Sequence, residues 1–156
     1  MSVYLHRIGL LQPFVDLGGG GELLLDPDID NVPPDEWIPY DFLASVDIDF
    51  SGEGVLVTDL GGDSGANIGA VFEAVSGTTY RFTGTIATFS VGPPVTSAVG
   101  FQPAGFGTFD GTSTTSTGPF SLDWTSDTTG PVIVGAEINL ATGNSFRLSN
   151  TSVVAL

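Results

Sequence analysis

From about residue 43 onward, apolar and polar residues alternate in short segments that turn residues separate. In "VDIDF", Val46, Ile48 and Phe50 fall on one side and the two aspartates on the other. Six further strand-like segments follow, namely "GEGVLVTDLGG", "NIGAVFEAV", "TTYRFTGTIATF", "PFSLDWT", "PVIVGAEINL" and "NSFRLSNTSVVAL". A period of two indicates half-buried strands, and no segment here has the 3.6-residue period of a helix. The pattern predicts an all-β antiparallel sandwich over residues 41–156.

Residues 1–40 lack this alternation, and we predict that they form an extended, irregular N-terminal arm. The region contains the glycine run Gly18 to Gly21, which favours a hinge, and "VPPDEWIPYD" with its adjacent Pro33 and Pro34. Proline cannot donate a backbone hydrogen bond to a neighbouring strand, so these prolines favour a connector here rather than a strand. The apolar residues expected to bury the arm against other subunits are Val3, Leu5, Ile8, Leu10, Leu11 and Phe14.

The chain is strongly acidic, with 18 acidic residues, three arginines, no lysine and a formal net charge of −15. Nucleic acids and anionic membranes are bound by clustered basic side chains, so neither is expected as a partner. The absence of cysteine excludes disulfides and thiolate chemistry. The first apolar run is interrupted by His6, Arg7, Gln12 and Pro13, which argues against a signal peptide or a membrane span.

The three arginines are Arg7, Arg81 and Arg147. In "TTYRFTGTIATF", Arg81 shares its side of the strand with threonines, so it is expected to point away from the core, and Arg147 has the same setting. The simpler hypothesis is that each pairs with a carboxylate on a neighbouring strand. The alternative is that these cations contact acidic residues of another subunit.

Enzymatic chemistry is not expected. Gly62-Asp63-Ser64-Gly65 resembles the nucleophile turn of trypsin-like serine proteases, but that chemistry needs a histidine base, and the only histidine is His6 in the arm. The segment is better explained as a turn. One histidine and no cysteine also exclude a zinc site. Carboxylate pairs for glycoside hydrolysis cannot be distinguished among so many acids.

"DPDIDN" is the candidate metal segment, because calcium is bound by several carboxylate oxygens. It fails as an EF-hand, since Asn31 stands where that loop needs glycine and Trp37 where it needs glutamate. An irregular calcium site at Asp26, Asp28 and Asp30 stays the alternative to solvated acidic turns. No other cofactor is expected.

Several aromatic residues fall in irregular or loop context, including residues 100–118, "GFQPAGFGTFDGTSTTSTG", which are expected to contain a loop hairpin. These aromatics could form a sugar-stacking platform, or could instead close the ends of the sandwich or lie in an oligomer contact. They are Trp37, Tyr40, Phe101, Phe106 and Phe109.

From Trp37 onward, the order of features resembles the carbohydrate-binding-module jelly rolls with galactose-binding-like topology. The resemblance is carried by "GVLVTDL", "AVFEAVSGTTYRFTGTI" and the closing "NSFRLSNTSVVAL". It implies a jelly-roll sandwich, glycan binding of the kind seen on secreted enzymes, and use on tailed-phage virions as decorations, spikes or fibre modules. Ser149 stands where the family often has an aspartate that helps to hold calcium.

Two functions are therefore expected from the sequence. The first is a non-enzymatic structural protein of a tailed-phage virion, as a capsid decoration, spike or tail component. It would be assembled in the host cytoplasm as a homo-oligomer that contacts other virion proteins such as the major capsid protein. The alternative is a glycan-binding module that mediates adhesion to polysaccharide.

Overall fold

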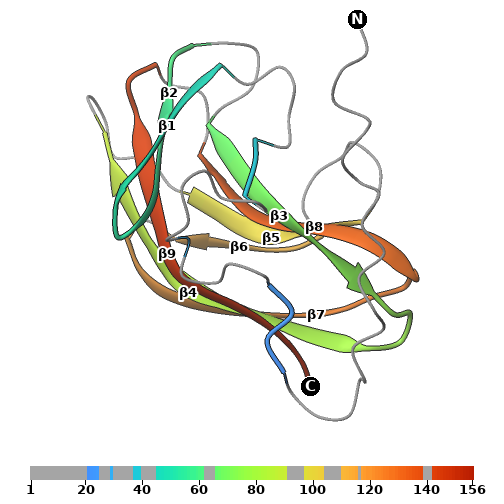
Figure 1. The fold of residues 1–156 in the computed structure, drawn as a ribbon. Helices are drawn as coiled ribbons and strands as arrows, with labels where there is room; N and C mark the ends of the chain where they lie inside the picture. The colour runs from blue at the N-terminus through green and yellow to red at the C-terminus, as the bar shows by residue number, and fades with distance from the viewer. Residues whose placement is uncertain are drawn as a thin grey trace, which may run out of the picture.

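A computed structural model describes residues 21–24, 29, 37–39, 45–61, 66–90, 97–103, 110–115, 117–138 and 142–156. These residues form nine β-strands and no helix, which confirms the predicted all-β class (Figure 1). The strands are β1 (Val46–Gly52), β2 (Gly54–Asp59), β3 (Asn67–Ala74), β4 (Thr79–Phe89), β5 (Ser97–Pro103), β6 (Asp110–Thr115), β7 (Thr117–Thr125), β8 (Gly130–Ile138) and β9 (Ser145–Ala155).

The strands pair into two antiparallel sheets, which pack against each other as the layers of a sandwich (Figure 1). One sheet has five strands in the order β1-β2-β9-β4-β7, and the other has four in the order β3-β8-β5-β6. The predicted hairpin in residues 100–118 is present as the antiparallel pair β5 and β6. The chain crosses between the sheets several times, as the predicted jelly-roll sandwich requires.

The core lies between the sheets and follows the predicted alternation. In β4, Tyr80, Phe82 and Ile86 are fully buried, whereas the threonines between them are half-buried on the outer side. Aromatic rings connect the layers, since Phe101 of the four-stranded sheet stacks on Trp124 of the five-stranded sheet at 4.9 Å with an interplanar angle of 14°. Burying each such ring stabilises the sandwich by a few kcal/mol (about 2–5).

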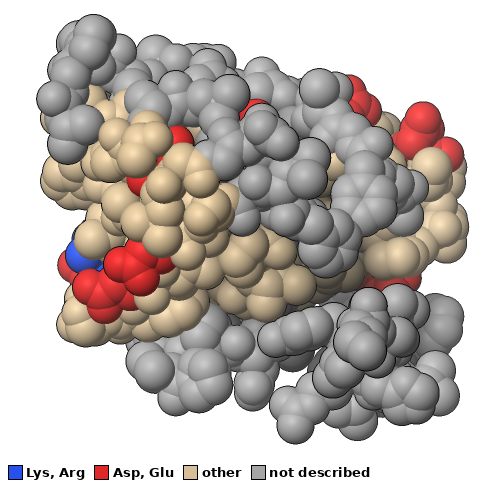
Figure 2. All heavy atoms as spheres, turned by 90° about the horizontal axis from the view of Figure 1, so that it is seen from above, with Lys and Arg blue, Asp and Glu red and all other residues tan. Residues whose placement is uncertain are grey.

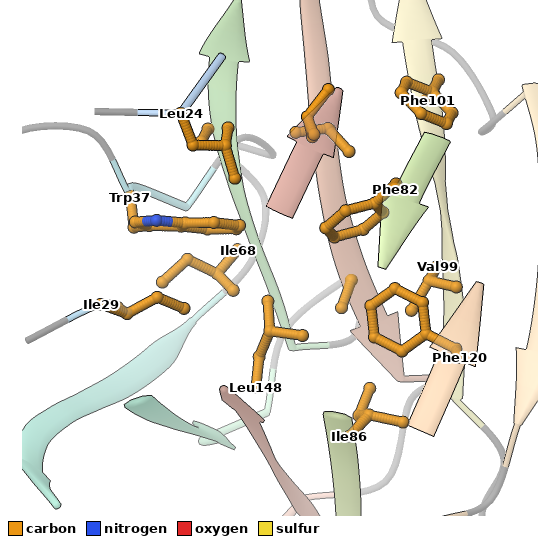
Figure 3. Close-up of a cluster of buried hydrophobic side chains, with 14 of the residues drawn as sticks. Leu24, Ile29, Trp37, Ile68, Phe82, Ile86, Val99, Phe101, Phe120 and Leu148 are labelled. Atoms are coloured by element: carbon orange, nitrogen blue, oxygen red, sulfur yellow. The ribbon is translucent and has the colours of Figure 1, made fainter. Parts of the chain in front are cut away.

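Parts of the region predicted as an arm belong to this core. Leu24, Ile29 and Trp37 are only 5%, 0% and 2% exposed. Their side chains lie together beside Ile68 and Leu148 (Figure 3). The prediction of an arm that packs on other subunits is therefore wrong for these segments, because their apolar side chains are buried in their own sandwich. The six predicted arm residues, Val3, Leu5, Ile8, Leu10, Leu11 and Phe14, lie outside the described residues.

Glu22 attaches this N-terminal segment to β9. Its Oε1 accepts hydrogen bonds from the amides of Leu23 (3.0 Å), Leu24 (2.9 Å) and Val153 (2.9 Å). The amide of Leu23 in turn donates to the carbonyl oxygen of Val153 at 2.9 Å. Because β2 pairs only with the first half of β9, this segment covers part of the β9 edge that β2 leaves open. A covered edge cannot pair with another chain.

Candidate functional site

Three glycines align across the outer face of the four-stranded sheet. Gly69 of β3 is opposite Gly135 of β8, which is opposite Gly100 of β5. The residues on either side of each glycine point into the core, so these three positions face outward. With strands about 4.8 Å apart, this glycine row is a strip roughly 10 Å long without side chains. Ile38 pairs with Gly69 and extends the row at the β3 edge.

Rows of side chains border the glycine row on both sides. Successive residues on one face of a strand are about 6.7 Å apart, so the two bordering rows are separated by roughly 13 Å. The row on one side consists of Asn67, Glu137 and Ala98, and the row on the other side of Val71, Ile133 and Gln102. Together with Ile38, the glycine row and these two rows are called the glycine-row face below.

Exposure varies across the glycine-row face. The three glycines are buried, as are Asn67 (2% exposed) and Gln102 (6% exposed) in the bordering rows. Ile38 and Val71 are 54% and 45% exposed, and Ile133 and Glu137 are half-buried. Exposed aliphatic side chains such as Ile38 and Val71 can pack against the C–H surface of a ligand. The exposed part of this face therefore offers an apolar contact surface to a ligand.

Gly135 also has a structural reason to be glycine. A Cβ atom built on it would collide with the carbonyl oxygen of Ile68 and would lie 2.9 Å from the Cα of Gly69. The backbones of β3 and β8 therefore approach too closely for a side chain at this position.

The outer face of the five-stranded sheet carries a cross-strand ion pair. Arg81 of β4 lies opposite Asp123 of β7 and donates from Nε to Oδ1 and from Nη2 to Oδ2, both at 2.7 Å. This confirms the prediction that Arg81 points outward and pairs with a carboxylate on a neighbouring strand. The hydrogen bonds from Arg81 lower the pKa of Asp123, and its positive charge adds to the effect. The pKa of Arg81 is raised by the same partner.

Arg147 lies on the same outer face, where it contacts the turn between β1 and β2. Its Nη1 donates to the carbonyl oxygen of Glu53 at 3.0 Å, and its guanidinium group occupies the space where Gly52 has no side chain. The pKa of nearby Asp49 is lowered chiefly by hydrogen bonds from Ser51, with a smaller contribution from Arg147. Figure 2 shows a basic area bordered by acidic side chains at one edge of the molecule. Arg7 lies outside the described residues.

The predicted aromatic platform is wrong for the two members that the structure describes. Trp37 is 2% exposed and Phe101 is fully buried, so neither ring presents a face to solvent. Phe101 belongs to β5 rather than to a loop, and its ring is held against Trp124. Tyr40, Phe106 and Phe109 lie outside the described residues. The alternative, in which such aromatics pack inside the sandwich, holds for Trp37 and Phe101.

The predicted calcium ligands Asp26, Asp28 and Asp30 are likewise outside the described part of the chain. Within that part, no three His, Cys, Asp or Glu side chains come together in a way that could hold a metal ion. The same residues contain no helix suited to spanning a membrane.

Sequence reasoning missed the glycine row. The available signal was a glycine flanked by two core residues in each of three strands, as in "IGA", "VGF" and "VGA". Nothing in the chain shows, however, that these glycines stand opposite one another, because that depends on the register between distant strands.

No protein-family model and no curated protein matches this chain. Among solved structures, a family 4 carbohydrate-binding module is similar with a TM-score of 0.61 at 15% identity, over 83% of this chain and 88% of that one. The module CBM61 in complex with β-1,4-galactotriose gives a TM-score of 0.51 at 12% identity, over 87% and 99%. This chain has the jelly-roll fold of these modules.

A phage protein also has this fold as part of a longer chain. The enzymatically active domain of tailspike protein 4 from bacteriophage CBA120 matches with a TM-score of 0.53 at 9% identity. The match covers 86% of this chain and 21% of the tailspike chain. At this level of identity the likeness concerns the fold alone.

Proposed function

We propose that this protein is a non-catalytic module that binds a polysaccharide. The observation that carries the proposal is the fold likeness to carbohydrate-binding modules, which extends over 88% and 99% of two such modules. Since folds host many functions, the binding surface has to be argued from this chain's own residues.

The glycine-row face is the proposed binding surface. Its exposed part is formed by Ile38 and Val71, which lie beside the buried glycine row at the β3 edge. Ile38, Val71 and Ile133 offer aliphatic surface for the C–H faces of sugar rings. All these residues except Ile38 belong to paired strands, so little conformational entropy is lost on binding.

The outer face of the five-stranded sheet is less suited to this role. Its central polar group is the Arg81–Asp123 pair, in which each partner already satisfies the other. A ligand that competed for either group would have to break two charge-assisted hydrogen bonds. The remaining described positions of β4 and β7 on this face carry mainly threonine and serine.

Binding is tested with soluble xylan and β-1,4-galactan by affinity electrophoresis and titration calorimetry. Val71→Asp places a charge on the glycine-row face, whereas Ser121→Asp places the same charge on an exposed strand position of the opposite face. We expect Val71→Asp to weaken binding at least tenfold and Ser121→Asp to leave it unchanged, with both variants folded by circular dichroism. Absence of binding to either polymer, or equal loss in both variants, would overturn the proposal.

We propose further that this module has no hydrolytic activity, which a reducing-sugar assay on both polymers would check. The predicted virion location, homo-oligomer and capsid partners stay predictions. The tailspike likeness is the one observation that favours a virion setting, because it places the same fold within a phage protein. Light scattering of the purified chain distinguishes a monomeric module from an oligomeric virion component.

A further inference from the structure

β3 lies at one edge of the four-stranded sheet, so β8 is its neighbour on one side only (Figure 1). Hydrogen bonds on both sides show which way its backbone groups point. Gly69 and Ile38 exchange two backbone hydrogen bonds of 2.9 Å each, and the amide of Ile138 in β8 donates to the carbonyl oxygen of Ala66 at 2.9 Å. Odd-numbered residues of β3 therefore direct their N–H and C=O groups to the open edge, and even-numbered residues direct theirs to β8.

A short stretch of this edge, at Val71 and Glu73, is left open. Ile38 pairs with the strand on one side of the stretch. On the other side, the amide of Val75 donates to the hydroxyl group of Tyr80 at 2.8 Å. Between these contacts, none of the residues that the structure describes bonds to the N–H and C=O groups that Val71 and Glu73 direct outward. Unpaired backbone groups of this kind can add an extended chain to a sheet.

The side chains beside the open stretch indicate which chain it accepts. Val71 and Ile38 are exposed and offer an apolar contact, and Glu73 is exposed next to Val71 on the same face of the strand. The ion pair that the described residues form joins Arg81 to Asp123, so Glu73 has no cationic partner among them. The formal net charge of −15 also attracts cationic ligands.

A second copy of this chain is a poorer occupant. If two β3 edges paired around a two-fold axis at Phe72, Glu73 of one copy would lie diagonally across from Glu73 of the other, about 7–8 Å away. Like charges at such positions destabilise a strand pair, and charged residues on exposed edges oppose self-pairing. A chain that brings a lysine or arginine to this position is instead attracted by the same carboxylate.

We propose that the open stretch of the β3 edge is a docking site for an extended basic peptide segment, which adds to the sheet as a further strand. The segment runs antiparallel to β3, as Ile38 does on the same edge. It places a lysine or arginine opposite Glu73 and, two residues later, an aliphatic residue opposite Val71. Backbone hydrogen bonds provide the affinity, and the charged pair provides the selectivity. This site does not depend on the proposed polysaccharide binding.

The probe is a terminally blocked peptide of sequence Thr-Lys-Thr-Val-Thr, titrated into the full chain and followed by NMR. We expect it to bind about tenfold more tightly than Thr-Glu-Thr-Val-Thr in low salt. N-methylation of its valine amide should weaken binding, because the peptide then loses the donor to the carbonyl oxygen of Val71. The peptide should also protect the amides of Val71 and Glu73 from hydrogen exchange, whereas the amide of Phe72, which points to β8, is protected with and without it.

Two variants separate the local effect of Glu73 from the effect of total charge. Glu73→Lys and Asp47→Lys both change the formal net charge from −15 to −13, and both replace an exposed strand residue, but Asp47 belongs to β1 of the other sheet. We expect Glu73→Lys to reverse the preference in favour of the glutamate peptide and Asp47→Lys to retain the preference for lysine. Thermal melts check that both variants fold.

Several outcomes would overturn the docking site. These are no binding of the lysine peptide, equal binding of the two peptides, or an equal effect of the two lysine variants. Protection of the Val71 and Glu73 amides without peptide would also overturn it, and light scattering would then show whether a second copy covers the edge. Polysaccharide binding is measured separately with xylan and β-1,4-galactan, so either proposal can fail alone.

Discussion

Replacement of Trp37 by alanine tests whether the segment before residue 40 is part of the sandwich. Trp37 is 2% exposed and lies in the same cluster as Leu24, Ile29 and Ile68. If the segment were an independent arm, this substitution would leave the body unaffected. If it belongs to the core, Trp37→Ala leaves a cavity and lowers the free energy of unfolding of the whole domain.

The size of the effect follows from the buried area. A buried tryptophan removes about 150–250 Å² from water, which at about 25 cal/mol per Å² corresponds to roughly 4–6 kcal/mol. This is an upper bound, because the unfolded chain is already partly collapsed, so we expect a loss of about 3–5 kcal/mol. For a chain of 156 residues, that loss lowers Tm by roughly 10 °C.

Urea denaturation followed by circular dichroism measures this loss, and the adjacent Ile38 supplies the control. Ile38 is 54% exposed and contacts β3 through its backbone, so Ile38→Ala should cost less than about 1 kcal/mol. A loss below about 1 kcal/mol for Trp37→Ala, or equal losses in both variants, would refute the reasoning. Deleting residues 1–40 should likewise unfold the body, since it removes three core side chains.

Two further predictions concern a turn and an ion pair. Gly54→Ala should cost at least about 3 kcal/mol in urea denaturation, because φ is +71° and a Cβ would lie 2.7 Å from that of Ser149. Gly77→Ala, at φ +82° but in open space, should cost only about 1–2 kcal/mol, and equal losses would contradict this. Since Arg81 lowers the pKa of Asp123, the ion pair contributes its full stabilisation of the fold above the ordinary aspartate pKa of about 3.9. This contribution is lost as the pH falls through the lower pKa that Asp123 has in the folded state. In an NMR titration, Arg81→Gln should raise the Asp123 midpoint, and an unchanged midpoint would count against the pair.

The sequence by itself determined the fold class and the direction of most strand side chains. Alternation in β4 assigned Tyr80 and Phe82 to the core and Arg81 to the surface, because successive side chains of a strand point to opposite faces. A surface arginine in an acidic chain then finds a carboxylate on a neighbouring strand, as Arg81 does with Asp123. These properties depend on local spacing, which the sequence contains directly.

Only the tertiary structure decided where the irregular segments lie and which strands are neighbours. Trp37 follows two prolines and looks like a residue of a connector, yet it is buried in the core because the adjacent Ile38 pairs with Gly69 at the β3 edge. Gly69, Gly100 and Gly135 form one row only because β3, β8 and β5 pair in a particular register. Register and edge packing arise from contacts between residues far apart in the chain, and no local period encodes them.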